Sequence, residues 1–221
     1  LIPRLQRLKD PAGEVPAFER RLDDALFEYK ADLFARWSLP DALGREAHST
    51  ELDAVRAAFR WIAAEAAAAP ARLAHRDFQS QNLHLCSDRG GGERLVMIDI
   101  QGAFLAPPEY DLVCLLRDSY VELPEHEVGS HLERVRPLLP DRPEPDCFAR
   151  RFDLLTLSRK GKDHARFLYA ARGRGDRRFA RYLSNTVRSL RGAAARVAGL
   201  DPSLARLADM VQALPESSCA G

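Results

Sequence analysis

The chain has 221 residues, enough for one well-buried domain or two small ones. Apolar residues make up 46% of it and charged residues 29%, as in an ordinary globular protein, and the formal net charge is only +1. A net charge this small gives no overall electrostatic attraction for a nucleic acid or a membrane surface. The most apolar stretch, Trp61 to Ala69, is too short to cross a membrane and contains Glu65.

The cysteines indicate a reducing compartment. Cys86, Cys114, Cys147 and Cys219 are widely spaced, and no Cys-x-x-Cys pair suggests a zinc site. We expect Cys86 and Cys114 to be buried thiols, because apolar residues surround both. With no secretory signal in view, we expect a soluble, cytoplasmic protein.

The first seventy residues predict helices. After a short helical start at Leu1 and a turn from Pro11 to Pro16, apolar residues follow helical spacing from Phe18 to about Trp37. A loop from Pro40 to Ser49 precedes a helix that we expect Ser49 to cap and Pro70 to end.

The next stretch carries the chemistry. It reads His75-Arg76-Asp77-Phe78-Gln79-Ser80-Gln81-Asn82, and an apolar hairpin follows that ends at Asp99. Phosphoryl transfer from a nucleotide needs a carboxylate that orients the attacking hydroxyl, and oxygen ligands for magnesium. Asp77 can supply the first, and Asn82 and Asp99 the second.

The hairpin sequence predicts that the two expected metal ligands, Asn82 and Asp99, lie opposite each other. Strand-like runs flank the turn residues Asp88 to Gly92, and a turn centred between Gly90 and Gly91 sets Asn82 opposite Asp99. The same register puts Leu83 and Leu85 on one face with Val96 and Ile98.

Other polar residues in this stretch have more than one interpretation. His75 is a candidate general base, but we favour a structural brace. Arg76 either pairs with a carboxylate or is solvated, and Gln79 and Gln81 either orient a substrate hydroxyl or bind backbone groups. Gln101 either supports Asp99 or contacts a sugar. We expect His84 to be a surface or packing residue.

Helices follow to the end of the chain. One begins at Pro107 and runs to about Tyr120, with Asp111 in its first turn, where a carboxylate complements the helix dipole. The others are expected at Glu125 to Leu138, Cys147 to Ala171, Arg177 to Val197 and Pro202 to Leu214. Residues 150–191 contain thirteen Lys or Arg against three Asp, which we interpret as a solvated basic helix face.

These motifs resemble a known family. His75 to Asn82, followed by Ile98-Asp99-Ile100-Gln101, is similar to the catalytic loop and metal-binding strand of the aminoglycoside phosphotransferase/choline kinase-like family. With Pro107 to Leu112 and Leu115 to Asp118 added, the pattern is most similar to bacterial N-acetylmuramate/N-acetylglucosamine anomeric kinases. The resemblance is firm over about 75–120. Gly102 departs from it, since those kinases usually carry an acidic residue there.

The resemblance implies an α+β, mostly helical fold, the C-terminal lobe of a protein-kinase-like enzyme with a small β-hairpin carrying the catalytic and metal residues. Over 1–221 it implies a helical substrate-side region (about 1–70), the catalytic loop and hairpin (about 71–105) and C-terminal helices (about 108–214). None of the four lysines lies in the strand that the family uses for nucleotide, and no phosphate-covering glycine loop is visible. We therefore expect a missing N-terminal nucleotide-binding lobe, without which the fragment is inactive.

The resemblance also assigns roles to single residues. It implies that Asp111 hydrogen-bonds the catalytic-loop backbone, and that Arg117 and Asp118 lie on the acceptor side, with an ordinary surface pair as the alternative. Glu28 and Asp32 could contact substrate.

The expected activity is transfer of phosphate from ATP, with Mg²⁺, to the anomeric hydroxyl of an N-acetylated amino sugar in cell-wall recycling. Alternatives are an aminoglycoside or choline-type kinase, or a catalytically silent lobe. The partners expected are the sugar and the nucleotide, with no nucleic acid or membrane.

Overall fold

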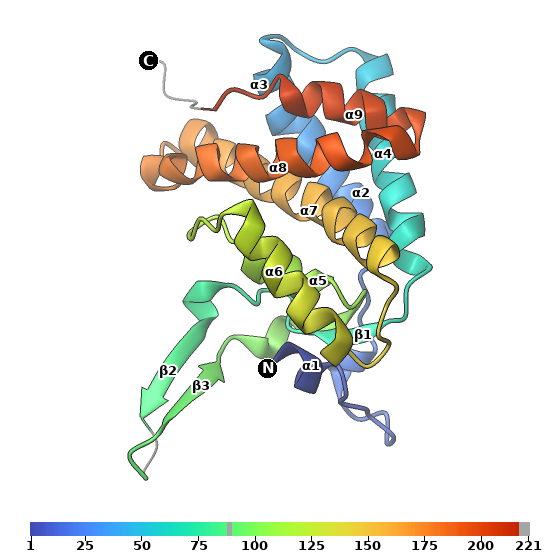
Figure 1. The fold of residues 1–221 in the computed structure, drawn as a ribbon. Helices are drawn as coiled ribbons and strands as arrows, with labels where there is room; N and C mark the ends of the chain where they lie inside the picture. Colours follow the sequence, from blue (N-terminus) through green and yellow to red (C-terminus); the bar gives the residue numbers. More distant parts are fainter. Residues whose placement is uncertain (88–89, 217–221) are drawn as a thin grey trace. The chain divides into compact units, whose positions relative to one another are not determined.

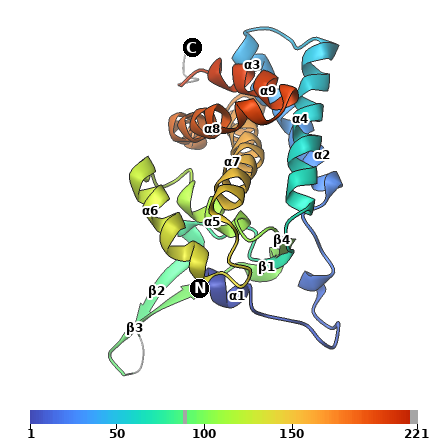
Figure 2. The ribbon, with the colours of Figure 1, turned by 45° about the vertical axis from the view of Figure 1, so that its right-hand side comes forward.

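The structure is a computed structural model that describes residues 1–87 and 90–216. The chain forms two compact units, and each is built from two separate stretches of sequence. The first unit comprises Leu1–Leu22 and Ala69–Pro145, and the second comprises Asp23–Ala68 and Asp146–Gly221. Figure 1 and Figure 2 show the elements of each unit along the chain.

The first unit combines short strands and helices around a small core. Its strands are β1 (Arg72–Ala74), β2 (Leu83–Ser87), β3 (Glu93–Met97) and β4 (Phe104–Ala106). Its α-helices are α1 (Ile2–Leu5), α5 (Tyr110–Leu116) and α6 (Glu125–Val135). Short 3-10 turns lie at Pro16–Phe18, Ser80–Asn82, Ile100–Gly102 and Arg136–Leu138. Leu5, Leu73 and Ala103 form the buried centre, against which Phe18 and Leu105 pack.

A pair of strands that was not predicted closes the motif region. β1 and β4 are antiparallel, with Ala74 opposite Phe104 and Arg72 opposite Ala106. Leu105 extends the arrangement, because its amide donates to the carbonyl of Arg20 at 2.8 Å and its carbonyl accepts from Leu22. The chain therefore leaves this ribbon just before the motif and returns to it just after Asp99.

The hairpin β2–β3 has a different register from the predicted one. Leu83 pairs with Met97 and Ser87 with Glu93, so the pairing is centred on Gly90 and not between Gly90 and Gly91. Because residues 90–92 are all glycine, the sequence permits the turn at more than one position. In the structure the positive φ of 79° falls at Gly91.

The one-residue shift changes the pairing at the open end of the hairpin. Asn82 lies opposite Ile98, whose amide donates to the Asn82 carbonyl at 3.0 Å, and Asp99 follows one residue later. The predicted pairing of Asn82 with Asp99 is therefore wrong. Leu85 shares its face with Leu95, and both are exposed.

The second unit is a set of packed helices. It contains α2 (Asp24–Leu33), α3 (Leu39–Leu43), α4 (Ser49–Ala67), α7 (Pro145–Leu168), α8 (Leu183–Val197) and α9 (Pro202–Gln212). α4 packs against α2 and α9, and α9 also packs against α8, as Figure 2 shows. Fully buried aromatic side chains lie in this core, among them Phe27, Phe34, Phe59 and Phe152.

Several helix ends differ from the predicted positions. α2 begins at Asp24, later than expected, because the Asp23 side chain accepts the amide hydrogen of Leu26 at 3.0 Å and caps it. α4 starts at Ser49 itself, so the predicted cap at Ser49 is wrong, and Glu51 accepts from the amide of His48. The helix expected from Arg177 starts as a 3-10 helix (Arg177–Tyr182) before α8.

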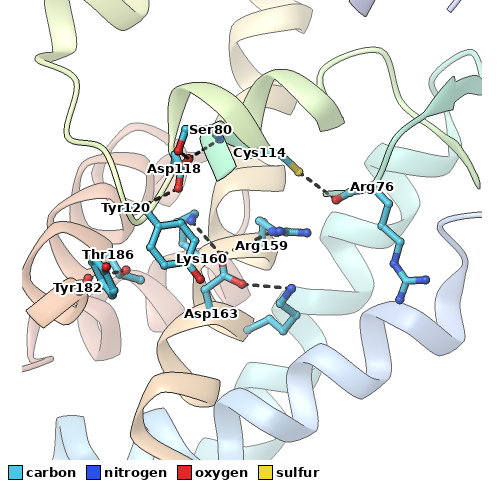
Figure 3. Close-up of polar contacts among 11 residues, drawn as sticks. Arg76, Ser80, Cys114, Asp118, Tyr120, Arg159, Lys160, Asp163, Tyr182 and Thr186 are labelled. Atoms are coloured by element: carbon cyan, nitrogen blue, oxygen red, sulfur yellow. Dashed lines mark hydrogen bonds and ion pairs between the residues drawn. The ribbon is translucent and has the colours of Figure 1, made fainter. Parts of the chain in front are cut away.

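The basic stretch is not a uniform solvated face. Arg174, Arg177 and Arg178 are exposed, but Arg159 and Lys160 are buried in α7. Lys160 Nζ lies 2.9 Å from Asp163 Oδ2, a pair seen in Figure 3. Burial alone would raise the pKa of the Asp163 carboxyl, but Lys160, Lys162 and Arg159 together outweigh burial and hold that pKa well below its ordinary value.

Two expectations from composition have mixed outcomes. Cys114 is buried as predicted, whereas Cys86 is only half-buried, because it lies in the hairpin and not in the core. Among the described residues, no helix has the length and apolar character needed to span a membrane.

Candidate active site

The predicted motif forms a tight loop directly after β1, within the first unit. The carbonyl of Asp77 accepts two hydrogen bonds, from the amide of Gln79 at 2.9 Å and from Asn82 Nδ2 at 2.8 Å. The loop thus folds back so that the side chain of Asn82 lies against the backbone of Asp77. We call residues 75–82 the catalytic loop below.

Asp99 lies beside the end of this loop. Its predecessor Ile98 is hydrogen-bonded to Asn82, and Asp99 itself has a left-handed backbone, with φ of 68° and ψ of 35°. Gln101 Nε2 donates to Asp99 Oδ1 at 2.7 Å. This contact matches the supporting role considered for Gln101, and Asp99 is otherwise exposed to solvent.

His75 holds the loop to Ile98, the residue after β3. Its ring is fully buried, and Nε2 lies 2.8 Å from the carbonyl oxygen of Ile98, which can only accept. The ring also meets Phe78 edge-on, with 5.7 Å between centroids. This geometry is that of a brace, the interpretation favoured for His75.

Asp111 holds the backbone at the start of the loop. It is buried in the first turn of α5, and its two carboxylate oxygens accept from the amides of His75 at 2.7 Å and Arg76 at 3.1 Å. These are the hydrogen bonds that the family resemblance implied for Asp111.

Arg76 has a strained backbone and an exposed side chain. Its φ is 80°, a conformation that side-chain-bearing residues rarely adopt. Its carbonyl accepts from Cys114 Sγ at 3.2 Å, and its guanidinium lies over the Phe104 ring, 5.7 Å from the centroid. Gly102 is close by, since a Cβ there would lie 3.5 Å from Arg76 Cδ.

Arg117 and Asp118 are not an ordinary surface pair, because both are buried. Arg117 makes a two-pronged ion pair with Glu125, with Nη2 and Oε2 2.9 Å apart. Asp118 instead binds the catalytic loop at Ser80 (Figure 3). The sequence assigned no role to Ser80. Its position between Asp77 and Asn82 is the feature that could have marked its hydroxyl as part of the site.

The remaining predicted residues have simpler positions. Gln79 is half-buried and immediately precedes the 3-10 turn at Ser80–Asn82, while Gln81 and His84 are exposed. Glu28 and Asp32 lie on α2 in the second unit, where they border a cavity of about 500 Å³ with Arg56 and Arg60.

The donor set fits a magnesium ion. Because Asn82 Nδ2 donates to Asp77, the amide oxygen Oδ1 is the atom that a cation would meet, and Asp99 contributes a carboxylate. Both are hard oxygen donors, and Mg²⁺ typically takes one or two protein ligands and completes its octahedron with phosphate oxygens and water. Residues 1–87 and 90–216 contain no cluster of three or more His, Cys, Asp or Glu placed to hold a metal.

Comparison with known proteins agrees with this geometry. The chain matches the phosphotransferase enzyme family (APH) over residues 3–146. It is 28% identical over 214 residues to an N-acetylmuramate/N-acetylglucosamine kinase of Pseudomonas aeruginosa, which covers 95% of the chain and 60% of that protein. An enzyme of the same name from Neisseria meningitidis is 29% identical over 204 residues, 90% of the chain and 58% of that protein.

A third kinase of this name, from Caulobacter vibrioides, is 32% identical over 126 residues. The chain thus spans about three fifths of the length of the curated relatives that it matches most broadly. The family match covers more than half of the chain and includes the catalytic loop, Asp99 and α5. The predicted resemblance is confirmed, and the chain belongs to the phosphotransferase enzyme family.

Proposed function

We propose that this protein transfers the γ-phosphoryl group of ATP to the anomeric hydroxyl of an N-acetylated amino sugar, N-acetylmuramate or N-acetylglucosamine, in the cytoplasm. The observation that supports the proposal is a pair of hydrogen bonds made by Asn82 in the first unit. Asn82 is bonded through its side chain to Asp77 and through its carbonyl to the residue before Asp99. The names of the relatives support the choice of sugar.

Asp77 accepts or orients the hydrogen of the attacking hydroxyl. A hemiacetal hydroxyl is more acidic than an ordinary alcohol, so a carboxylate of ordinary basicity can serve, and no serine or cysteine nucleophile is needed. The fold-back of the loop holds the Asp77 backbone through the hydrogen bond from Asn82 Nδ2 to the Asp77 carbonyl.

Asn82 and Asp99 would hold Mg²⁺, which when bound neutralises charge on the transferring phosphate. Gln101 restrains one oxygen of Asp99, so the carboxylate meets the cation in a limited range of orientations. His75 and Asp111 fix the loop that carries Asp77, and they take no part in proton transfer.

The test uses the protein together with whatever sequence adjoins it in its gene. Replacing Asp77 by Asn should lower kcat by about 10²- to 10⁴-fold, while calorimetry shows Mg-ADP binding unchanged. Asp10→Asn is the matched control, since Asp10 also lies in the first unit and its carboxylate accepts from the exposed amide of Val15. Unchanged turnover in Asp77→Asn would refute the assignment of Asp77.

The acceptor is decided by a comparative phosphorylation assay with N-acetylmuramate, N-acetylglucosamine, kanamycin and choline. We expect kcat/KM to be greatest for one of the two N-acetylated sugars. A preference for kanamycin or choline would make the protein an aminoglycoside or choline-type kinase, and no turnover with any acceptor, despite Mg-ADP binding, would indicate a silent relative.

A further inference from the structure

One helix of the first unit reaches the catalytic loop at three points. Asp111 and Cys114 lie one turn apart on the same face of α5, and Asp118 lies two residues after the last residue of the helix. Asp111 accepts from the amides of His75 and Arg76, and Cys114 Sγ donates to the carbonyl of Arg76. The third contact, from Asp118, is to the other half of the loop, as Figure 3 shows.

Asp118 binds Ser80 twice. Its Oδ2 accepts from the Ser80 amide at 2.8 Å and from the Ser80 hydroxyl at 2.6 Å, while Oδ1 accepts from the amide of Tyr120 at 2.9 Å. The bond to Tyr120 is local. The two bonds to Ser80 join residues that lie 38 positions apart in the sequence, so the carboxylate does more than end its own helix.

Ser80 is placed where a restraint affects both halves of the site. It is the first residue of the 3-10 turn Ser80–Asn82, three residues after Asp77 and two before Asn82. The amide of Leu83 bonds back to the carbonyl of Ser80, which closes this turn. Fixing Ser80 therefore fixes the turn that presents the Asn82 side chain to Asp77.

The surroundings strengthen the contact. Ser80 and Asp118 border a cavity of about 450 Å³ whose other walls are mostly apolar, including Phe78, Leu112 and Leu115. Asp118 is 3% exposed. A hydrogen bond to a carboxylate is stronger where little water competes, and a buried donor that loses its acceptor is costly.

We infer that Asp118 is a positioning residue of the active site, which acts through Ser80 to set the placement of Asn82 relative to Asp77. Asp111 holds the start of the loop and Asp118 holds its end, so the loop is clamped on both sides of the reactive carboxylate. The inference rests on the proposed function for the roles of Asp77 and Asn82.

Two variants test the clamp. In Asp118→Asn the amide oxygen can accept from Ser80 or from Tyr120, but the new NH₂ group faces whichever donor is left. Ser80→Ala is milder, since it removes the hydroxyl and keeps the backbone. Asp10→Asn is again the control, because it weakens a carboxylate-to-amide bond in the same unit far along the chain from the loop.

The first readout is amide hydrogen exchange of the 221-residue chain by NMR, without ligand. In Asp118→Asn we expect protection of the Ser80 amide to fall at least about tenfold relative to amides of α5, whereas Asp10→Asn changes only Val15. Exchange of Ser80 within about twofold of wild type, or an equal acceleration of all amides in the unit, would overturn the inference.

The second readout is kinetic. Asp118→Asn and Ser80→Ala should each lower kcat, by about tenfold or more for the first, with the acceptor KM nearly unchanged, because a misplaced turn harms the reaction and not acceptor binding. Ser80→Ala should add little in the Asp118→Asn background, and fully multiplicative effects would contradict coupling through Ser80.

The two proposals fail in different ways. A wild-type protein that phosphorylates no acceptor would end the proposed function, while the exchange experiment would still show whether Asp118 restrains the loop. Should Asp118→Asn fail to fold, Ser80→Ala still decides. Wild-type exchange at Gln81 and Asn82 together with wild-type kcat in that variant would refute the clamp.

Discussion

His75 Nε2 donates to the carbonyl oxygen of Ile98 at 2.8 Å, and so joins the first residue of the catalytic loop to the residue before Asp99. The ring is fully buried and this nitrogen is engaged, so His75 is not placed to take a proton from substrate. The contact joins the hydrogen bond between Ile98 and Asn82 in holding the catalytic loop next to the segment that carries Asp99.

Changing His75 to Leu should therefore lower kcat and stability together. The part-buried hydrogen bond to the Ile98 carbonyl would be lost, which costs about 0.5–1.5 kcal/mol in the free energy of unfolding. His75→Gln is the matched variant, because its Nε2 can reach nearly the same position. Urea unfolding and steady-state kinetics measure both effects, and equal losses in the two variants would show that the hydrogen bond is not what matters.

Replacing Asp111 by Asn should lower the free energy of unfolding, because it leaves one hydrogen-bond-accepting oxygen where the carboxylate has two. The carboxylate accepts from the amides of His75 and Arg76, whereas a carboxamide has a single oxygen and would leave one of these two amides unpaired. We expect a loss of about 1–3 kcal/mol in the free energy of unfolding, measured with urea. Amide exchange should rise at His75 or Arg76 first, and a rise confined to other residues would contradict this assignment.

The register of the hairpin can be checked by disulfide formation. Leu85 faces Leu95 across β2–β3, so cysteines at these two positions should oxidise readily in a background with Cys86 changed to Ser. Cysteines at Leu85 and Val96, which the register predicted from the turn would pair, should not. Mass spectrometry after mild oxidation counts the bonds, and efficient crosslinking of the second pair would support the predicted register instead.

His164 should make the second unit less stable in mild acid. Burial, assisted by the charge of Arg172, lowers the pKa of its imidazole to about 4, below the ordinary value of 6.5. Between these values the unfolded chain binds a proton that the folded chain does not. The stabilising contribution is thus complete above about pH 6.5 and is lost as the pH falls towards 4.

From pH 7 to pH 5 this one group should reduce the free energy of unfolding by about 2 kcal/mol. His164→Asn keeps a polar atom near Ser38 Oγ, which lies 2.9 Å from His164 Nδ1, and removes the titration. Urea unfolding of both proteins at pH 7, 6 and 5 gives the difference. Asp176, whose pKa is lowered to about 2, titrates below this window, and parallel curves would exclude His164 as the source.

Local pattern and family resemblance predicted much of this molecule. The loop from His75 to Asn82 and the hairpin after it follow from residues close in sequence, whereas the brace role of His75 follows from the resemblance to kinase-like folds. The exact register did not, because three adjacent glycines allow more than one turn and the strands have exposed residues on both faces, which specifies pairing weakly.

The hydrogen bonds of Asp118 to Ser80 could not be predicted from the sequence, for a different reason. A carboxylate after a helix reads equally well as a surface residue, and only the packing of α5 against the loop brings it to Ser80. The same holds for Lys160 and Arg159, whose burial depends on how α7 is covered and not on the charge of their neighbours. Tertiary contacts decided these positions, as they do wherever local preference is weak.

The pairing of Ala74 with Phe104 has one more consequence. Because both ends of the segment between them are tied to each other, and the Ile98 amide is bonded to the Asn82 carbonyl at the base of the hairpin, the number of residues between Asn82 and Ile98 can vary without moving the backbone that carries Asp77 and Asp99. Insertions or deletions in that interval would be absorbed away from the reacting groups, and homologous chains of different length could perform the same chemistry.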